Sequence, residues 1–120
     1  METTEFLYKG WVYKQSRFMK KWRRRYAVIT NTHIMTFESE NINETPTEIL
    51  LIKHCKGVKS AEEDTNKPNS FCIDYEGVLF YFYTDTAEEK TKWIGLISKG
   101  IIAPNIKQIK QYESDSSDED

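Results

Sequence analysis

The sequence predicts an α+β fold in which six or seven short strands form a sandwich or a small barrel and one C-terminal helix covers it. Short runs rich in β-branched and aromatic residues recur through residues 7–84 of the 120-residue chain. Polar stretches separate these runs. After Tyr83 the pattern changes to an apolar residue at every fourth position, which indicates one amphipathic helix.

The expected strands follow one another closely along the chain. They are Leu7–Lys14, Arg23–Thr30, His33–Glu38, Glu48–Ile52, Phe71–Tyr75 and Val78–Thr84. A tight turn at Asn31-Thr32 joins the second strand to the third, and polar loops are expected at Ser39–Thr47 and Ser60–Asn69. The last two strands meet at Glu76-Gly77, where glycine supplies the positive φ that a two-residue hairpin needs.

The C-terminal helix has a clear start signal, because Thr86 and Glu89 fit a capping box. Its apolar face is formed by Trp93, Ile97 and Ile101. Pro104 is expected to end the helix, since a proline inside a helix removes a hydrogen bond. We therefore predict one domain at residues 1–103 and an extension at residues 104–120.

The extension is expected to comprise a polar tether, Asn105–Tyr112, and a disordered acidic tail, Glu113–Asp120. One hypothesis is that an extended tether lets the tail fold back onto basic residues, and the alternative is a solvated tail. Met1 and the acidic end at Asp120 favour a complete small protein. One domain of this size is expected to be a monomer.

Charge is distributed unevenly along the chain, whose formal net charge is −2. Residues 1–30 hold eight Lys or Arg residues and two Glu residues, whereas the acidic tail has no basic residue. Such polarity predicts an anionic partner at one end. The polar N-terminus lacks the features of a signal peptide, and two cysteines without one, Cys55 and Cys72, suggest a cytoplasmic protein with reduced thiols.

Three basic residues are expected to converge at the rim of the barrel. Because successive side chains on a strand point to opposite faces, Arg23 and Arg25 share a face of the second strand, and Lys14 ends the corresponding row of the first. We call Lys14, Arg23 and Arg25 the basic cup. Guanidinium groups match phosphate oxygens, so a ligand with two or more phosphates on a small ring suits this cup.

The loop Gln15–Trp22 adds the three loop cations Arg17, Lys20 and Lys21. Between them lie Phe18 and Met19, an aromatic ring beside a flexible thioether. Basic residues that flank an exposed apolar pair favour a membrane interface, with the cations facing lipid headgroups. The alternative is that Phe18 and Met19 fold back onto the barrel.

The combination of these motifs resembles a pleckstrin homology (PH) domain. The motifs are KGWVYK at residues 9–14, WRRRY at residues 22–26 and a helix tryptophan at Trp93, and the resemblance covers Leu7 to Ile101. It implies a seven-stranded antiparallel bent sandwich or barrel capped by one helix. Lys14, Arg23 and Arg25 match the pattern with which lipid-binding members of the family hold phosphoinositides.

The arrangement of these motifs is most similar to that in the PH domains of AGC-type kinases, which bind 3-phosphorylated inositol lipids. It differs on the third strand, where Phe37 and Glu38 stand in place of a tyrosine and a lysine, and residues 70–86 hold no Lys or Arg. The resemblance therefore implies a non-catalytic module that recruits the protein to a cytoplasmic membrane surface, as a peripheral protein, with the lipid isomer left open.

Other functional classes have less support. His54-Cys55 provides two potential metal ligands where zinc requires three or four, and no Gly-rich phosphate loop or oxyanion signature indicates an enzyme or a cofactor. A pI of about 5.8 argues against nucleic acid as the partner. The main alternative is a protein-interaction module with weak or no lipid binding, in which the basic loop is incidental. The row of arginines has a separate alternative explanation, which is the protection of an edge strand from aggregation.

Overall fold

The computed structural model describes residues 5–117, and the side chains of residues 5–103. Residues 1–4, where the predicted domain begins, and residues 118–120, which end the predicted acidic tail, lie outside the described residues. The elements in chain order are β1 (Phe6–Gln15), β2 (Trp22–Thr30), β3 (His33–Phe37), β4 (Glu48–Leu51), η1 (Ile52–His54), β5 (Cys55–Ser60), α1 (Glu62–Thr65), β6 (Ser70–Tyr75), β7 (Val78–Tyr83) and α2 (Ala87–Ser117).

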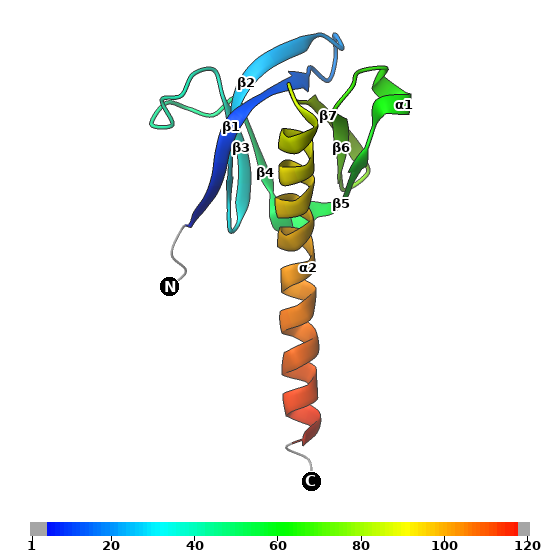
Figure 1. Ribbon diagram of the computed structural model, residues 1–120. Coiled ribbons are helices and arrows are strands. Elements are labelled where there is room, and N and C mark those ends of the chain that lie inside the picture. Colours follow the sequence, from blue (N-terminus) through cyan, green and yellow to red (C-terminus); the bar gives the residue numbers. More distant parts are fainter. Residues whose placement is uncertain (1–4, 118–120) are drawn as a thin grey trace.

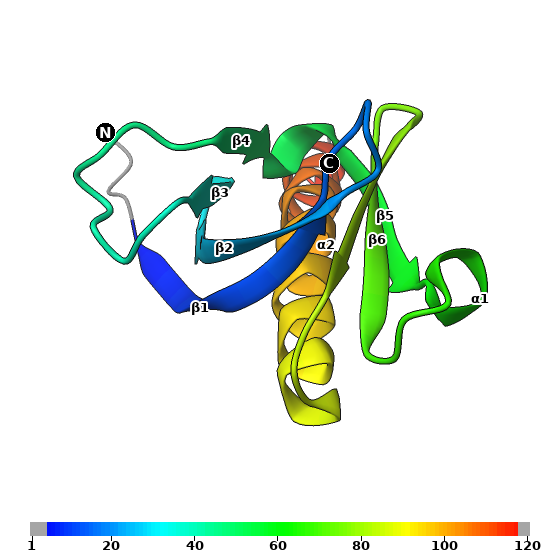
Figure 2. The ribbon, with the colours of Figure 1, turned by 90° about the horizontal axis from the view of Figure 1, so that it is seen from above.

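The seven strands form one antiparallel sheet in the order β4-β3-β2-β1-β7-β6-β5. The sheet does not close into a barrel, because β4 and β5 are its two edges. It bends around α2 instead, with β1 to β4 on one side of the helix and β5 and β6 on the other (Figures 1 and 2). The predicted fold class, a bent antiparallel sheet capped by a C-terminal helix, is confirmed.

The core lies between the bent sheet and the first turns of α2. Alternate strand residues face inward because the side-chain period of a strand is two. The core includes Val12, Ile29, Leu50, Phe71, Ile73, Phe80, Phe82, Trp93 and Ile97. Trp93 packs edge-on against Tyr8, with ring centroids 5.1 Å apart. The apolar helix face predicted from Trp93 and Ile97 therefore anchors α2 to the sheet.

The helix start and the hairpin turn predicted from the sequence both have the expected geometry. The hydroxyl of Thr86 accepts a hydrogen bond from the backbone N–H of Glu89, at 3.1 Å, as the capping-box pattern predicts. At the β6–β7 turn Glu76 and Gly77 both have positive φ, of 52° and 93°. Both central residues of a type I′ turn have this conformation, which fits the right-handed twist of the flanking strands.

Three expectations about the chain were wrong or incomplete. Pro104 does not end α2, which continues to Ser117. A proline costs one hydrogen bond of the helix, but the residues that follow it are rich in Lys, Gln and Ile and support helix formation. The predicted loop Ser60–Asn69 also contains the short helix α1, and β5 was not among the individually predicted strands.

The continued helix changes the geometry of the extension. The segment 105–112 is helical and not an extended tether, and residues 113–117 of the tail predicted to be disordered are helical as well. Figure 1 shows this part of α2 projecting beyond the sheet, on the side away from the loop between β1 and β2. The helix thus directs the start of the acidic segment away from the basic cup. Within residues 5–117, no helix is both long enough and apolar enough to cross a membrane.

Candidate functional site

The basic cup lies on the inner face of the β1–β2 hairpin. The two strands pair with Lys14 opposite Arg23 and Val12 opposite Arg25. Directly opposed residues of an antiparallel pair share a face of the sheet. Val12 is fully buried in the core, so Lys14, Arg23 and Arg25 all start from the face that covers the core. The alternation expected from the sequence is present.

The loop cation Arg17 lies over the same buried aromatic ring as Lys14. The Nζ atom of Lys14 lies 5.4 Å from the ring centroid of Phe80, and the guanidinium carbon of Arg17 lies 5.5 Å from the same centroid. Phe80 is buried and lies on the inner face of β7. The ring therefore brings two cations together from different parts of the hairpin, and the sequence analysis did not identify it.

The arginine between the two cup arginines is held on the outer face. The guanidinium carbon of Arg24 lies 3.9 Å from the ring centroid of Trp11. Trp11 in turn packs edge-on against Tyr26 and donates a hydrogen bond from Nε1 to the carboxylate of Glu40, at 3.1 Å. A cation over an aromatic face is attracted to it, by about 0.5–1 kcal/mol at an exposed site. Arg24 is therefore engaged within the protein.

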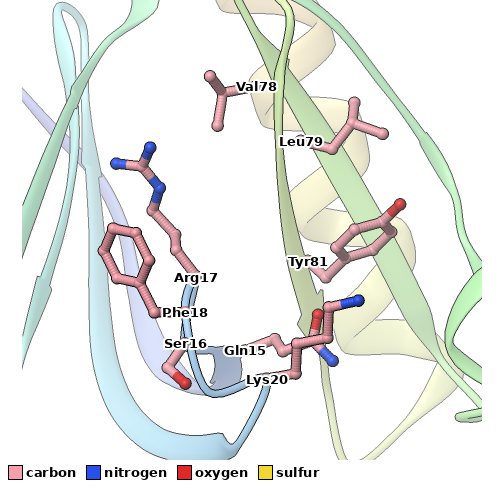
Figure 3. Close-up of a pocket in the computed structure, with 8 residues that line it drawn as sticks. All are labelled: Gln15, Ser16, Arg17, Phe18, Lys20, Val78, Leu79 and Tyr81. Atoms are coloured by element: carbon pink, nitrogen blue, oxygen red, sulfur yellow. The ribbon is translucent and has the colours of Figure 1, made fainter.

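The other two loop cations are separated from the basic cup. Lys20 lines a cavity of about 310 Å³ beside β7, together with Gln15, Tyr81 and Arg17. Figure 3 shows that the side chains of Arg17 and Lys20 extend to different sides of the loop. Lys21 is exposed, and its backbone N–H donates to the Ser16 hydroxyl at 3.0 Å. Of the three loop cations, Arg17 is the one that the described contacts place beside Lys14.

The apolar pair at the loop tip projects into solvent. Phe18 is 92% exposed and Met19 is 65% exposed, so neither side chain folds back onto the core. Val78 and Leu79, at the start of β7, are also exposed and line the same cavity as Phe18 (Figure 3). The sequence analysis did not name these two residues. The signal for them was a pair of branched apolar residues directly after the predicted turn between the last two strands.

A carboxylate lies within the cup. Oε1 of Glu48 is 3.1 Å from the Nζ atom of Lys14, and their side chains are 29% and 13% exposed. The pattern Glu48-Ile49-Leu50 gave a signal for this position, because alternation places Glu48 on the same face as the buried Leu50. The sequence could not reveal the contact with Lys14, since β3 and β2 lie between β4 and β1 in the sheet.

The cysteines are in environments that suppress nucleophilic chemistry. Both thiols are free and buried. Burial raises the pKa of Cys55 to about 11 and also raises the pKa of Cys72, so both remain protonated at neutral pH. The imidazole of His54 pairs with the carboxylate of Glu76. Among the residues whose side chains are described, no cluster of three or more His, Cys, Asp or Glu residues is arranged to hold a metal ion.

Comparison with known proteins identifies relatives across most of the chain. The family model of the PH domain matches residues 6–101. "Pleckstrin homology domain-containing protein 1" of Arabidopsis thaliana is 31% identical over 97 residues, which cover 78% of this chain and 67% of that protein. "RAC-beta serine/threonine-protein kinase A" of Xenopus laevis is 26% identical over 96 residues, which cover 71% of this chain and 19% of the kinase.

Solved structures share the fold at lower sequence identity. The C-terminal PH domain of pleckstrin in complex with D-myo-Ins(1,2,3,5,6)P5 superimposes with a TM-score of 0.72 at 22% identity, covering 83% of this chain and 99% of that one. The Slm1-PH domain in complex with inositol-4-phosphate superimposes with a TM-score of 0.67 at 19% identity, covering 80% of this chain and 96% of that one.

Proposed function

The chain belongs to the PH domain family, and on this premise we propose that it binds the headgroup of a phosphoinositide and recruits the protein to a cytoplasmic membrane surface. It acts as a non-catalytic module in this proposal. Lys14, Arg23 and Arg25 bind the phosphates of the headgroup. Arg17 adds a further contact from the loop, because its guanidinium shares the ring of Phe80 with Lys14.

The observation that carries the proposal is the contrast between the cup arginines and Arg24. Arg24 lies over the face of Trp11 on the outer side of the hairpin. Within the described side chains, neither Arg23 nor Arg25 forms an ion pair, although both start from the core face of the hairpin. Like charges at this rim repel one another unless an anion lies between them. A polyphosphorylated ring supplies that anion in a matching geometry.

The membrane contact in this proposal comes from the tip of the same hairpin. Phe18 and Met19 are exposed and enter the interfacial region of the bilayer. Lys20 and Lys21 face the anionic leaflet, where each basic residue contributes about 1 kcal/mol. Relatives support the ligand class, because structures of pleckstrin and Slm1 PH domains contain inositol phosphates.

Liposome sedimentation tests the proposal directly. Vesicles with phosphatidylserine and vesicles with added phosphoinositide are compared at the same total charge, and vesicles of neutral lipid serve as the blank. The proposal requires binding that depends on the phosphoinositide and exceeds binding to phosphatidylserine alone. Equal binding to both kinds of anionic vesicle indicates a diffuse charge effect. No binding to any vesicle favours the alternative function, a protein-interaction module.

A further inference from the structure

The carboxylate of Glu48 is the one acidic group that forms an ion pair with a cup residue among the described side chains. In a flat sheet the backbones of β4 and β1 would lie about 14 Å apart, because three inter-strand spacings of about 4.8 Å separate them. The bend of the sheet brings Glu48 and Lys14 to 3.1 Å. The fold therefore places a fixed negative charge next to the lysine that the proposed function assigns to phosphate.

A carboxylate at this position interacts differently with the hydroxyl groups and the phosphate groups of an inositol ring. It accepts a hydrogen bond from a hydroxyl group, and a charged acceptor strengthens that bond. It repels a phosphate group, and the repulsion is strong because both partners of the pair are mostly shielded from water. Arg23 and Arg25 have no such neighbour. The cup thus has one side that favours phosphate and one side that favours hydroxyl.

We infer that Glu48 is a specificity-determining residue that accepts a hydrogen bond from a free ring hydroxyl and disfavours headgroups with a phosphate at that ring position. The inference rests on the proposed function and adds the selectivity of the same site. Lys14 serves both groups, because its ammonium has three donors and reaches a phosphate while it keeps Glu48. Among polyphosphorylated headgroups, those with a free hydroxyl at that ring position bind preferentially, and those with a phosphate there, as in the most highly phosphorylated ones, are discriminated against.

The test compares Glu48→Gln with the wild-type protein by isothermal titration of soluble inositol mono-, bis-, tris- and tetrakisphosphates. Glutamine keeps the size of the side chain and an acceptor for Lys14 but removes the charge. We expect the affinity to rise by no more than about threefold for the monophosphate and by roughly tenfold or more for the tetrakisphosphate. Thermal unfolding of both proteins checks that the fold is retained.

The matched control is Glu44→Gln, in the loop before β4. It removes the same charge from a carboxylate that accepts hydrogen bonds from Ser39 and Asn41 and contacts no described cation. A gain that is equal for all headgroups, or a gain as large in Glu44→Gln, overturns the inference while the proposed function stands. If wild type binds none of the probes and Glu48→Gln binds the highly phosphorylated ones, the inference is supported. If neither protein binds any probe, both proposals are overturned.

Discussion

The two faces of the β1–β2 hairpin carry the same kinds of residue and use them in different ways. On the outer face Arg24 lies over Trp11, and Tyr13 stacks on Tyr83 with ring centroids 4.5 Å apart. On the inner face Arg23 and Arg25 rise from the end of the core without an ion pair among the described side chains. The comparison teaches that the outer-face arginine is held by an aromatic ring, whereas Arg23 and Arg25 form neither an ion pair nor a cation–π contact among the described side chains and Arg25 donates to the backbone carbonyl of Arg24.

The largest expected effect is the loss of headgroup affinity when an arginine of the inner face is removed. Arg25→Ala should abolish headgroup binding, a loss of about two orders of magnitude in affinity, because it removes a charge-assisted hydrogen-bond donor. The fold should survive, since the side chain is only partly buried. Titration with a soluble inositol phosphate measures the loss. If Arg24→Ala weakens binding as much as Arg25→Ala, the two faces do not differ and the site is a diffuse patch.

A smaller effect is expected at the tip, where the two faces meet. The double substitution Phe18→Ser and Met19→Ser should weaken liposome binding by about tenfold, because the bilayer offers an apolar phase for these exposed side chains. Affinity for a soluble inositol phosphate should remain within about twofold of wild type. Parallel sedimentation and titration make the comparison. An equal loss in both assays means that the pair shapes the loop.

A substitution at the opposite end of β1 should lower the stability of the fold without changing headgroup binding. The hydroxyl of Tyr8 donates to Oε1 of Glu89 at 2.6 Å, so Tyr8→Phe should cost about 0.5–1.5 kcal/mol in the free energy of unfolding and leave binding unchanged. This hydrogen bond, with burial and the charge of Glu89, raises the pKa of Tyr8 from 10.0 to about 12.

A raised folded-state pKa means that the contribution is complete below the unfolded-state value and is lost as the pH rises through the folded-state value. Wild-type stability should therefore decline between about pH 10 and pH 12. Urea unfolding across this interval should show a shallower decline for Tyr8→Phe. Identical slopes for the two proteins would contradict the assignment to Tyr8.

The smallest expected effect is that of the outer face. Arg24→Ala removes a cation–π contact at an exposed site and should cost about 0.5–1 kcal/mol of stability. Its effect on headgroup affinity should stay below about threefold. Chemical unfolding and titration of the same preparation give both values. A large loss of affinity with unchanged stability would reverse the roles of the two faces.

The sequence by itself determined the features that depend on local periodicity. Strand alternation assigned Arg23 and Arg25 to one face and Arg24 to the other, and the paired register agrees. The spacing of Trp93 and Ile97 identified the buried face of α2, and Thr86 identified its start. These properties follow from backbone geometry over a few residues, so they can be read without knowledge of the remainder of the chain.

Only the tertiary structure decided which distant groups meet. Arg17 and Lys20 both line the cavity beside the loop, yet only Arg17 also lies over Phe80, a residue of the distant strand β7. Glu48 reaches Lys14 because the sheet bends, although two strands separate them. Such contacts depend on the curvature of the sheet and on the packing of several elements at once, and no local pattern in the sequence encodes either.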